Sequence, residues 1–259
     1  MADHILGGFR VRFLILMSAL LTLPGSVPGQ ARDVDAKDLI DRVDRLLRGE
    51  SSHGTVEMKV TTRRWKRTLV LDIWSEGTDK ALIRILEPRK EKGTATLRMG
   101  SQIWNYLPKI DRTIRVPSSM MMGAWMGSHF TNDDLVKESR LIRDYEIELE
   151  FSGDRDGVEV YEIDLRPHED APVVWGRILY QIRQDDLMPV WSRFYDEHGE
   201  LKRTMRFSDY QIMGNRKVPA RMTLVPADHP DELTELVYRE LVFDIAILRR
   251  TFSLAALRE

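Results

Sequence analysis

Side chains that could carry out catalysis or hold a metal are scattered through this sequence rather than grouped. The chain has no cysteine, which excludes disulfides, thiolate nucleophiles and thiolate metal sites. It has six histidines, but no two share metal-ligand spacing on one expected element, and the motifs His-Glu-x-x-His and Gly-x-Ser-x-Gly do not occur. We therefore predict no catalytic residue, no metal site and no cofactor.

Three clusters of acidic residues are explained more simply by a structural role than by catalysis or metal binding. Adjacent strand residues point to opposite faces, so the aspartates at 185–186 cannot act together. The aspartates at 133–134 lie at an expected helix start, where carboxylates stabilise the positive end of the helix. The His-Glu-Asp run at 168–170 lies near two prolines, and we interpret it as a solvated loop.

Composition and charge are those of a globular protein. The 259 residues include 39 Lys and Arg against 41 Asp and Glu, which gives a net charge of -2 and argues against a nucleic-acid partner. Apolar residues make up 42% and charged residues 31%. Because there is no internal repeat or linker, one domain is the simpler prediction.

The N-terminus has the pattern of an export signal. Arg10 and Arg12 precede an apolar run at 13–23, and small residues and prolines follow at 24–31. As a helix this run rises about 16 Å, too short for a hydrocarbon core of about 30 Å. We predict a signal peptide over residues 1–31 and a mature, soluble, single-domain protein over 32–259. An uncleaved N-terminal anchor is the alternative.

The mature chain begins with one amphipathic helix and continues in strands. Asp35 is an expected cap for a helix that reaches about Leu47, with Gly49 as the stop. From Thr55 the apolar period changes to two, which is typical of strands. Strands are expected at 55–61, 69–74, 79–86, 94–99, 102–107, 112–116, 145–152, 158–166, 176–183, 190–196, 201–212, 217–225 and 235–243.

Eleven to thirteen such strands joined by short turns indicate an antiparallel meander. A sheet of this size must hide its edges, usually by curling toward a barrel. A basic run at 63–67 falls between two of the strands. We interpret it as a solvated strand edge, with docking on anionic lipid headgroups as the alternative.

The segment 117–138 is unusual because it combines methionines, aromatic residues and glycines. Thioethers adapt to irregular partners, and an apolar loop in water would cost solubility. We expect the segment to cover a hydrophobic space or to contact a membrane or partner, and then to enter a short helix at Thr131 or Asn132. The alternative is a loop that plugs its own core.

Several motifs in this region resemble one family. They lie at 86–88, 93–94, 104–108 and 112–115, and in the Gly-Ser-x-Phe-x-x-x-Asp-Leu block at 127–135. With these motifs the chain resembles the outer-membrane lipoprotein-sorting protein family, which is related to periplasmic lipoprotein carriers of the LolA/LolB type. The resemblance covers most of the mature chain and is strongest from about 80 to 140. The family usually has Asp where this chain has His129.

The resemblance implies a mainly β, LolA-like fold: a single strongly curved antiparallel sheet, an incomplete β-barrel, with a helical and loop lid. It also implies an apolar cavity that accepts acyl chains. Combined with the residue pattern, it places ligand-binding side chains in the cavity or its lid: Met120, Met121, Met122, Trp125, Met126, Phe130, Leu71, Trp104 and Tyr106.

The function expected from these features is a periplasmic carrier that shelters acyl chains of a lipoprotein or lipid during transfer toward the outer membrane. An inner-membrane transporter and a transient outer-membrane contact are the expected partners. One alternative is a non-enzymatic accessory or sensor subunit of that transporter, which docks through the Met-rich segment. A periplasmic lipid hydrolase is a third and weaker hypothesis.

Overall fold

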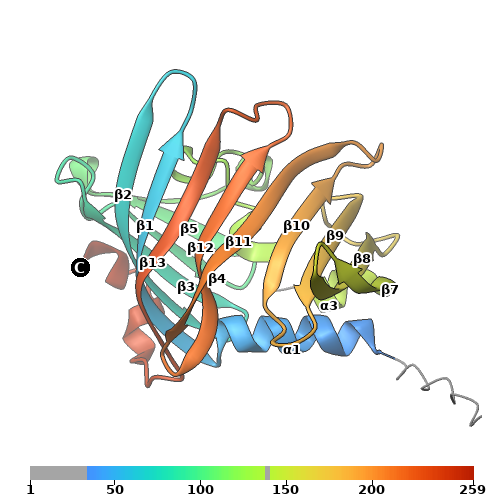
Figure 1. Cartoon of the computed structure of the whole chain (residues 1–259). Helices are drawn as coiled ribbons and strands as arrows, with labels where there is room; N and C mark the ends of the chain where they lie inside the picture. The colour runs from blue at the N-terminus through green and yellow to red at the C-terminus, as the bar shows by residue number, and fades with distance from the viewer. Residues whose placement is uncertain (1–33, 138–140) are drawn as a thin grey trace, which may run out of the picture. The chain divides into compact units, whose positions relative to one another are not determined.

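The computed structural model describes residues 34–137 and 141–259 (Figure 1). The signal peptide predicted over residues 1–31 lies outside these ranges, so it stays a prediction. Within the described part of the chain, no helix is long and apolar enough to cross a membrane.

The described residues form one 13-stranded antiparallel sheet in the order β6-β5-β4-β3-β2-β1-β13-β12-β11-β10-β9-β8-β7. The sheet curves strongly, and its edge strands β6 and β7 do not pair with each other (Figure 1). The single curved antiparallel sheet is therefore confirmed, and the predicted strands are all present. Their bounds are β1 Ser51–Thr61, β2 Lys66–Glu76, β3 Lys80–Glu87, β4 Ala95–Met99, β5 Gln102–Leu107, β6 Arg112–Arg115, β7 Tyr145–Arg155, β8 Val158–Pro167, β9 Arg177–Arg183, β10 Pro189–Tyr195, β11 Leu201–Met213, β12 Arg216–Pro226 and β13 Leu233–Phe243.

Alternation along the strands builds the core on the concave face. In β1, Val56, Met58 and Val60 are buried, while Lys59 between them is exposed. These residues pack with apolar side chains of β2, β3, β11 and β12. Because side chains alternate between faces, one apolar series per strand is sufficient to line this interior.

Helix α1 (Ala36–Arg48) covers part of the sheet. Asp35 caps it by accepting hydrogen bonds from the backbone N–H groups of Lys37 and Asp38, and Gly49 ends it with φ 67°. Leu39, Ile40 and Val43 are buried against a cluster from β7, β8 and β9. The helix, its cap and its stop all agree with the sequence prediction.

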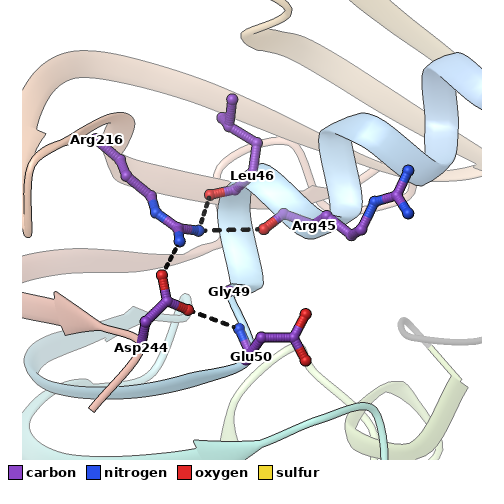
Figure 2. Close-up of a pocket in the computed structure, with 6 residues that line it drawn as sticks. All are labelled: Arg45, Leu46, Gly49, Glu50, Arg216 and Asp244. Carbon is purple, nitrogen blue, oxygen red and sulfur yellow. Dashed lines mark hydrogen bonds and ion pairs between the residues drawn. The ribbon is translucent and has the colours of Figure 1, made fainter.

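The C-terminal end of α1 is tied to the sheet by a small polar cluster (Figure 2). The Arg216 guanidinium donates to the carbonyls of Arg45 and Leu46 and pairs with Asp244. Asp244 also accepts from the N–H of Glu50 at 2.9 Å. A cation at helix carbonyls complements the negative end of the helix. The cluster therefore holds α1 against the β11–β12 turn.

A second segment, which we call the lid (residues 117–137), follows β6. It contains η2 (Ser118–Met120), η3 (Trp125–Gly127) and α2 (Asp134–Lys137), and α3 (Leu141–Asp144) precedes β7. A β-bridge between Ala124 and Thr131 and a bond from Asp133 N–H to the Met121 carbonyl fold the lid into a hairpin. Thr131 and Asp134 exchange hydrogen bonds at the start of α2, as its sequence predicts.

The convex face carries a third cluster. The C-terminal segments η5 (Arg249–Phe252) and η6 (Ala256–Arg258) pack there on β3, β4 and β5. Phe252, Ala256 and Leu257 are buried against Leu82 and Leu97. Several strands are thus apolar on both faces because each face has its own cover.

Candidate functional site

A cavity of about 370 Å³ lies between α1, the lid and the concave face of the sheet. This volume is within the range of small-molecule sites, which is about 300–1,000 Å³. Residues of α1, of the lid and of strands from both halves of the sheet line it. Its wall is mainly apolar and aromatic, and the side chains that contribute include Ile40, Val43, Ile73, Tyr180, Phe194, Met205, Phe207 and Tyr238.

A buried ion pair joins the lid to the cavity wall. Arg203 on β11 donates two hydrogen bonds to the Asp134 carboxylate, at 2.7 and 2.5 Å. The Arg203 side chain is 8% exposed and that of Asp134 13%. The Arg203 guanidinium lies 4.4 Å from the ring centres of both Trp175 and Phe194. The pair is thus held in an aromatic environment, where losing one partner would be costly.

Tyr145 at the start of β7 also lines the cavity and is buried. Burial raises the pKa of its phenol far above the ordinary value of 10, and the nearby Asp144 and Asp133 carboxylates raise it further. The phenol is therefore neutral over the physiological pH range, and it presents a ring and a hydroxyl to the cavity rather than a charge.

The lid hairpin is fixed to several strands. The Trp125 indole N–H donates to Thr96 Oγ1 on β4 at 3.2 Å, and Arg67 on β2 donates to the Met126 carbonyl at 2.9 Å. His129 bonds to Thr234 Oγ1 on β13 through both its backbone N–H and its ring Nδ1. The hairpin therefore spans the concave face from β4 to β13.

The structure distributes the nine predicted binding residues over four places, three of which hold seven of them. Phe130 is the one that lines the cavity. Trp125 and Leu71 are buried in the adjacent core, and Met126 packs against it. Met121 is half-buried, whereas Met120 and Met122 are 58% and 49% exposed. The lid therefore plugs the core with its aromatic residues and leaves two methionines in solvent.

Trp104 and Tyr106 on β5 require a correction. The sequence placed them in the cavity, but they pack on the convex face against the cluster under the C-terminal segment. Ile103, the residue before Trp104, is the fully buried residue of that strand and by alternation faces the other side. The alternation along β5 is visible in the sequence. The two aromatic residues were predicted on the concave face and lie on the convex one.

Sequence reasoning missed most of the cavity wall. The wall residues of β9–β13, such as Tyr180, Phe194, Met205 and Phe207, come from strands whose alternation is clear in the sequence. In the sequence, these positions are marked by large apolar residues that alternate along a strand with polar or charged ones. This pattern identifies a cavity wall only once the position of α1 shows which face of the sheet is covered.

A second hollow of about 440 Å³ lies at the C-terminal end of α1 (Figure 2). It is lined by Arg45, Leu46, Gly49, Glu50, Arg216 and Asp244. The bonds of its Arg216 and Asp244 side chains are those that hold α1 in place. Four of its six lining residues are charged, and we assign it a structural role. Within residues 34–137 and 141–259, no group of three His, Asp or Glu residues is placed to hold a metal ion.

The open antiparallel sheet, the covering helix and the lid form a LolA-like fold. The fold is similar to that of a DUF1329 family protein from Desulfovibrio piger, with TM-score 0.78 and 21% identity over 86% of this chain and 97% of that chain. A putative outer membrane lipoprotein-sorting protein domain from Vibrio parahaemolyticus has TM-score 0.76 and 22% identity, covering 86% and 98%. A LolA superfamily protein from Nitrosomonas europaea has TM-score 0.72 and 20% identity, covering 86% and 99%.

A family model described as "Uncharacterized protein" matches residues 77–259. The match covers more than half of the chain, so the chain belongs to this family. A comparison with curated proteins finds no match. The resemblance to the lipoprotein-sorting family is confirmed at the level of the fold.

Proposed function

We propose that this protein is a non-enzymatic periplasmic carrier. It shelters the acyl chains of a lipoprotein or lipid in its cavity during transfer toward the outer membrane. The observation that carries the proposal is the apolar and aromatic cavity enclosed by α1 and the lid. The structural neighbours include a lipoprotein-sorting domain and a LolA superfamily protein, which supports the same class of ligand.

The energetics of acyl transfer explain why such a cavity is needed. Each methylene removed from water is worth about 0.8 kcal/mol, so a chain of about fourteen carbons gains about 10 kcal/mol on burial. A free acyl chain would therefore not leave a membrane without cover. Rearranging an ordered lid opposes binding, which lowers the net affinity and permits release.

The lid contacts fit a closed carrier. Trp125 and Phe130 fill the interior beside the cavity, and the Arg203–Asp134 pair holds the other end of the lid. A ligand longer than the present cavity would have to displace these anchors. We infer that loading opens the lid and that the anchors favour closure when the carrier is empty.

A second candidate function is supported by the exposed methionines. Met120 and Met122 lie in solvent on the lid, and unbranched thioethers adapt to varied partner surfaces. An accessory or sensor subunit of an inner-membrane transporter would use such a surface for docking. In that case the protein would need no cargo of its own.

Native mass spectrometry of the mature protein, purified without detergent, distinguishes these functions. A carrier is expected to retain acyl-containing species that are released by organic solvent and identified by lipid analysis. A homogeneous ligand-free mass, both as purified and after incubation with acylated peptide or phospholipid, would contradict the carrier proposal. Such a result together with a stable complex with the transporter would support the accessory role.

A further inference from the structure

One end of the sheet collects turns that lie far apart in the sequence. Because adjacent strands are antiparallel, the turns after β1, β3 and β5 lie at the same end. Arg67 at the start of β2 pairs with Glu91 of the next turn and bonds to the lid at Met126. Arg63 in the β1–β2 turn pairs with Asp231 in the β12–β13 turn. We call this end, which includes the β1–β2 hairpin tip in Figure 1, the rim.

The rim is divided by charge. Its turns and adjoining strand residues on the β1–β6 side, at 62–67, 87–93 and 107–112, contain nine Lys and Arg against three Asp and Glu. Its turns on the β8–β13 side, at 168–176, 196–202 and 227–232, contain eight Asp and Glu against one Lys. A protein of net charge -2 thus carries a strongly basic half-rim beside a strongly acidic one.

Most cations of the basic half-rim are available for a partner. Arg63 and Arg67 are engaged in ion pairs. Among the described residues, the other seven have no ion-pair partner, and all of them are exposed. These seven are Arg64, Lys66, Arg89, Lys90, Lys92, Lys109 and Arg112.

Large apolar side chains stand in solvent among these cations. Trp65 at the tip of the β1–β2 hairpin is 43% exposed, and Ile110 in the β5–β6 turn is 58% exposed. Isolated exposed apolar residues are ordinary, but here they occur on two turns of one basic surface. Tryptophan interleaved with Lys and Arg is typical of side chains at a membrane interface.

We propose that the basic half-rim docks this protein on an anionic lipid surface. Each Lys or Arg near such a surface is attracted by the anionic headgroups, and the apolar side chains can insert at the headgroup level. The acidic half-rim is repelled, so the protein tilts with the β1–β6 side toward the lipid. Exposed cations spread over separate turns fit a diffuse charged surface better than a folded acidic protein. This proposal goes beyond the proposed function and does not depend on the cavity's ligand.

Co-sedimentation with lipid vesicles tests the proposal. The mature protein is expected to bind vesicles of equal parts phosphatidylglycerol and phosphatidylcholine, to bind less at high salt, and not to bind pure phosphatidylcholine. The triple variant Arg64→Glu, Lys90→Glu and Lys109→Glu is expected to lose at least about tenfold in vesicle affinity. Trp65→Phe is expected to abolish much of the tryptophan blue shift that accompanies binding.

The matched control reverses three exposed arginines outside the rim, with Arg206→Glu, Arg249→Glu and Arg250→Glu. Both triple variants change the net charge equally, and circular dichroism verifies that each is folded. Equal loss of binding in the two variants would show that net charge alone acts, and would overturn the proposal. So would absence of binding to the anionic vesicles, which would leave an acidic protein as the partner. Acyl binding by the cavity is expected to persist in both variants, so failure here leaves the carrier proposal intact.

Discussion

Arg203 and Asp134 show at the level of single residues how the lid is held. Both are largely buried, and the Arg203 guanidinium lies 4.4 Å from the centres of two aromatic rings that pack on each other, Trp175 and Phe194. We expect Arg203→Met to cost about 3–5 kcal/mol, because it leaves a buried carboxylate without its partner. The double variant Arg203→Met with Asp134→Leu should recover most of this loss. Urea unfolding measures both, and equal destabilisation of the single and double variants would contradict the assignment.

Ile73 gives a direct test of cavity volume. It lines the cavity without being fully buried, so a larger side chain there would enter the empty space. Ile73→Trp should lower the affinity for a fluorescent acyl probe at least tenfold. It should also cost less than the about 1–3 kcal/mol typical of overpacking a filled core. Ile212→Trp is the control, because Ile212 is 72% exposed on the β11–β12 hairpin. A larger stability loss with unchanged probe affinity would show that the site is ordinary core.

The buried phenol of Tyr145 should make the free energy of unfolding depend on pH. Burial raises the pKa of its phenol in the folded state, so the folded protein holds this proton more tightly than the unfolded chain does. Its contribution is complete below the unfolded pKa of about 10 and is lost as pH rises above that value. Between pH 9 and 11, wild type should therefore lose about 1 kcal/mol more stability than Tyr145→Phe. Parallel losses in urea unfolding at the two pH values would contradict this expectation.

At the level of elements, the lid combines two roles in one hairpin. Trp125 is buried in the core, so Trp125→Ala should destabilise by about 3–5 kcal/mol. Met120→Ser with Met122→Ser should change stability by less than about 0.5 kcal/mol, because both side chains are in solvent. Thermal and urea unfolding compare the two variants. Similar small effects for both would mean that the lid is not anchored.

The elements that local sequence specifies were predicted well. Asp35 and Gly49 define the ends of α1 because capping and a positive φ depend on neighbouring backbone atoms alone. The strands follow from alternation within each segment. Thr131 and Asp134 start α2 by hydrogen bonds across three residues. In each case the information lies within a few positions of the element.

At the level of the whole molecule, the cavity depends on contacts that the local sequence does not contain. The faces of β5 are decided by Phe252 and Leu257, about 150 residues later in the chain, which cover Trp104 and Tyr106. The pairing of Asp134 with Arg203 joins residues on segments that only the curvature of the sheet brings together. Period-two alternation shows that the two faces of a strand differ, but it does not show which face lies in the interior. The binding residues were therefore harder to predict than the fold.

The central claim is that this interior holds an acyl chain. Photocrosslinking with a fatty acid that carries a diazirine near its methyl end tests it directly on the intact mature protein. Peptide mass spectrometry should place the adducts on cavity residues such as Tyr180, Met205 and Tyr238, and Ile73→Trp should remove them. Adducts confined to Met120, Met122 or the convex face, unaffected by Ile73→Trp, would contradict the account.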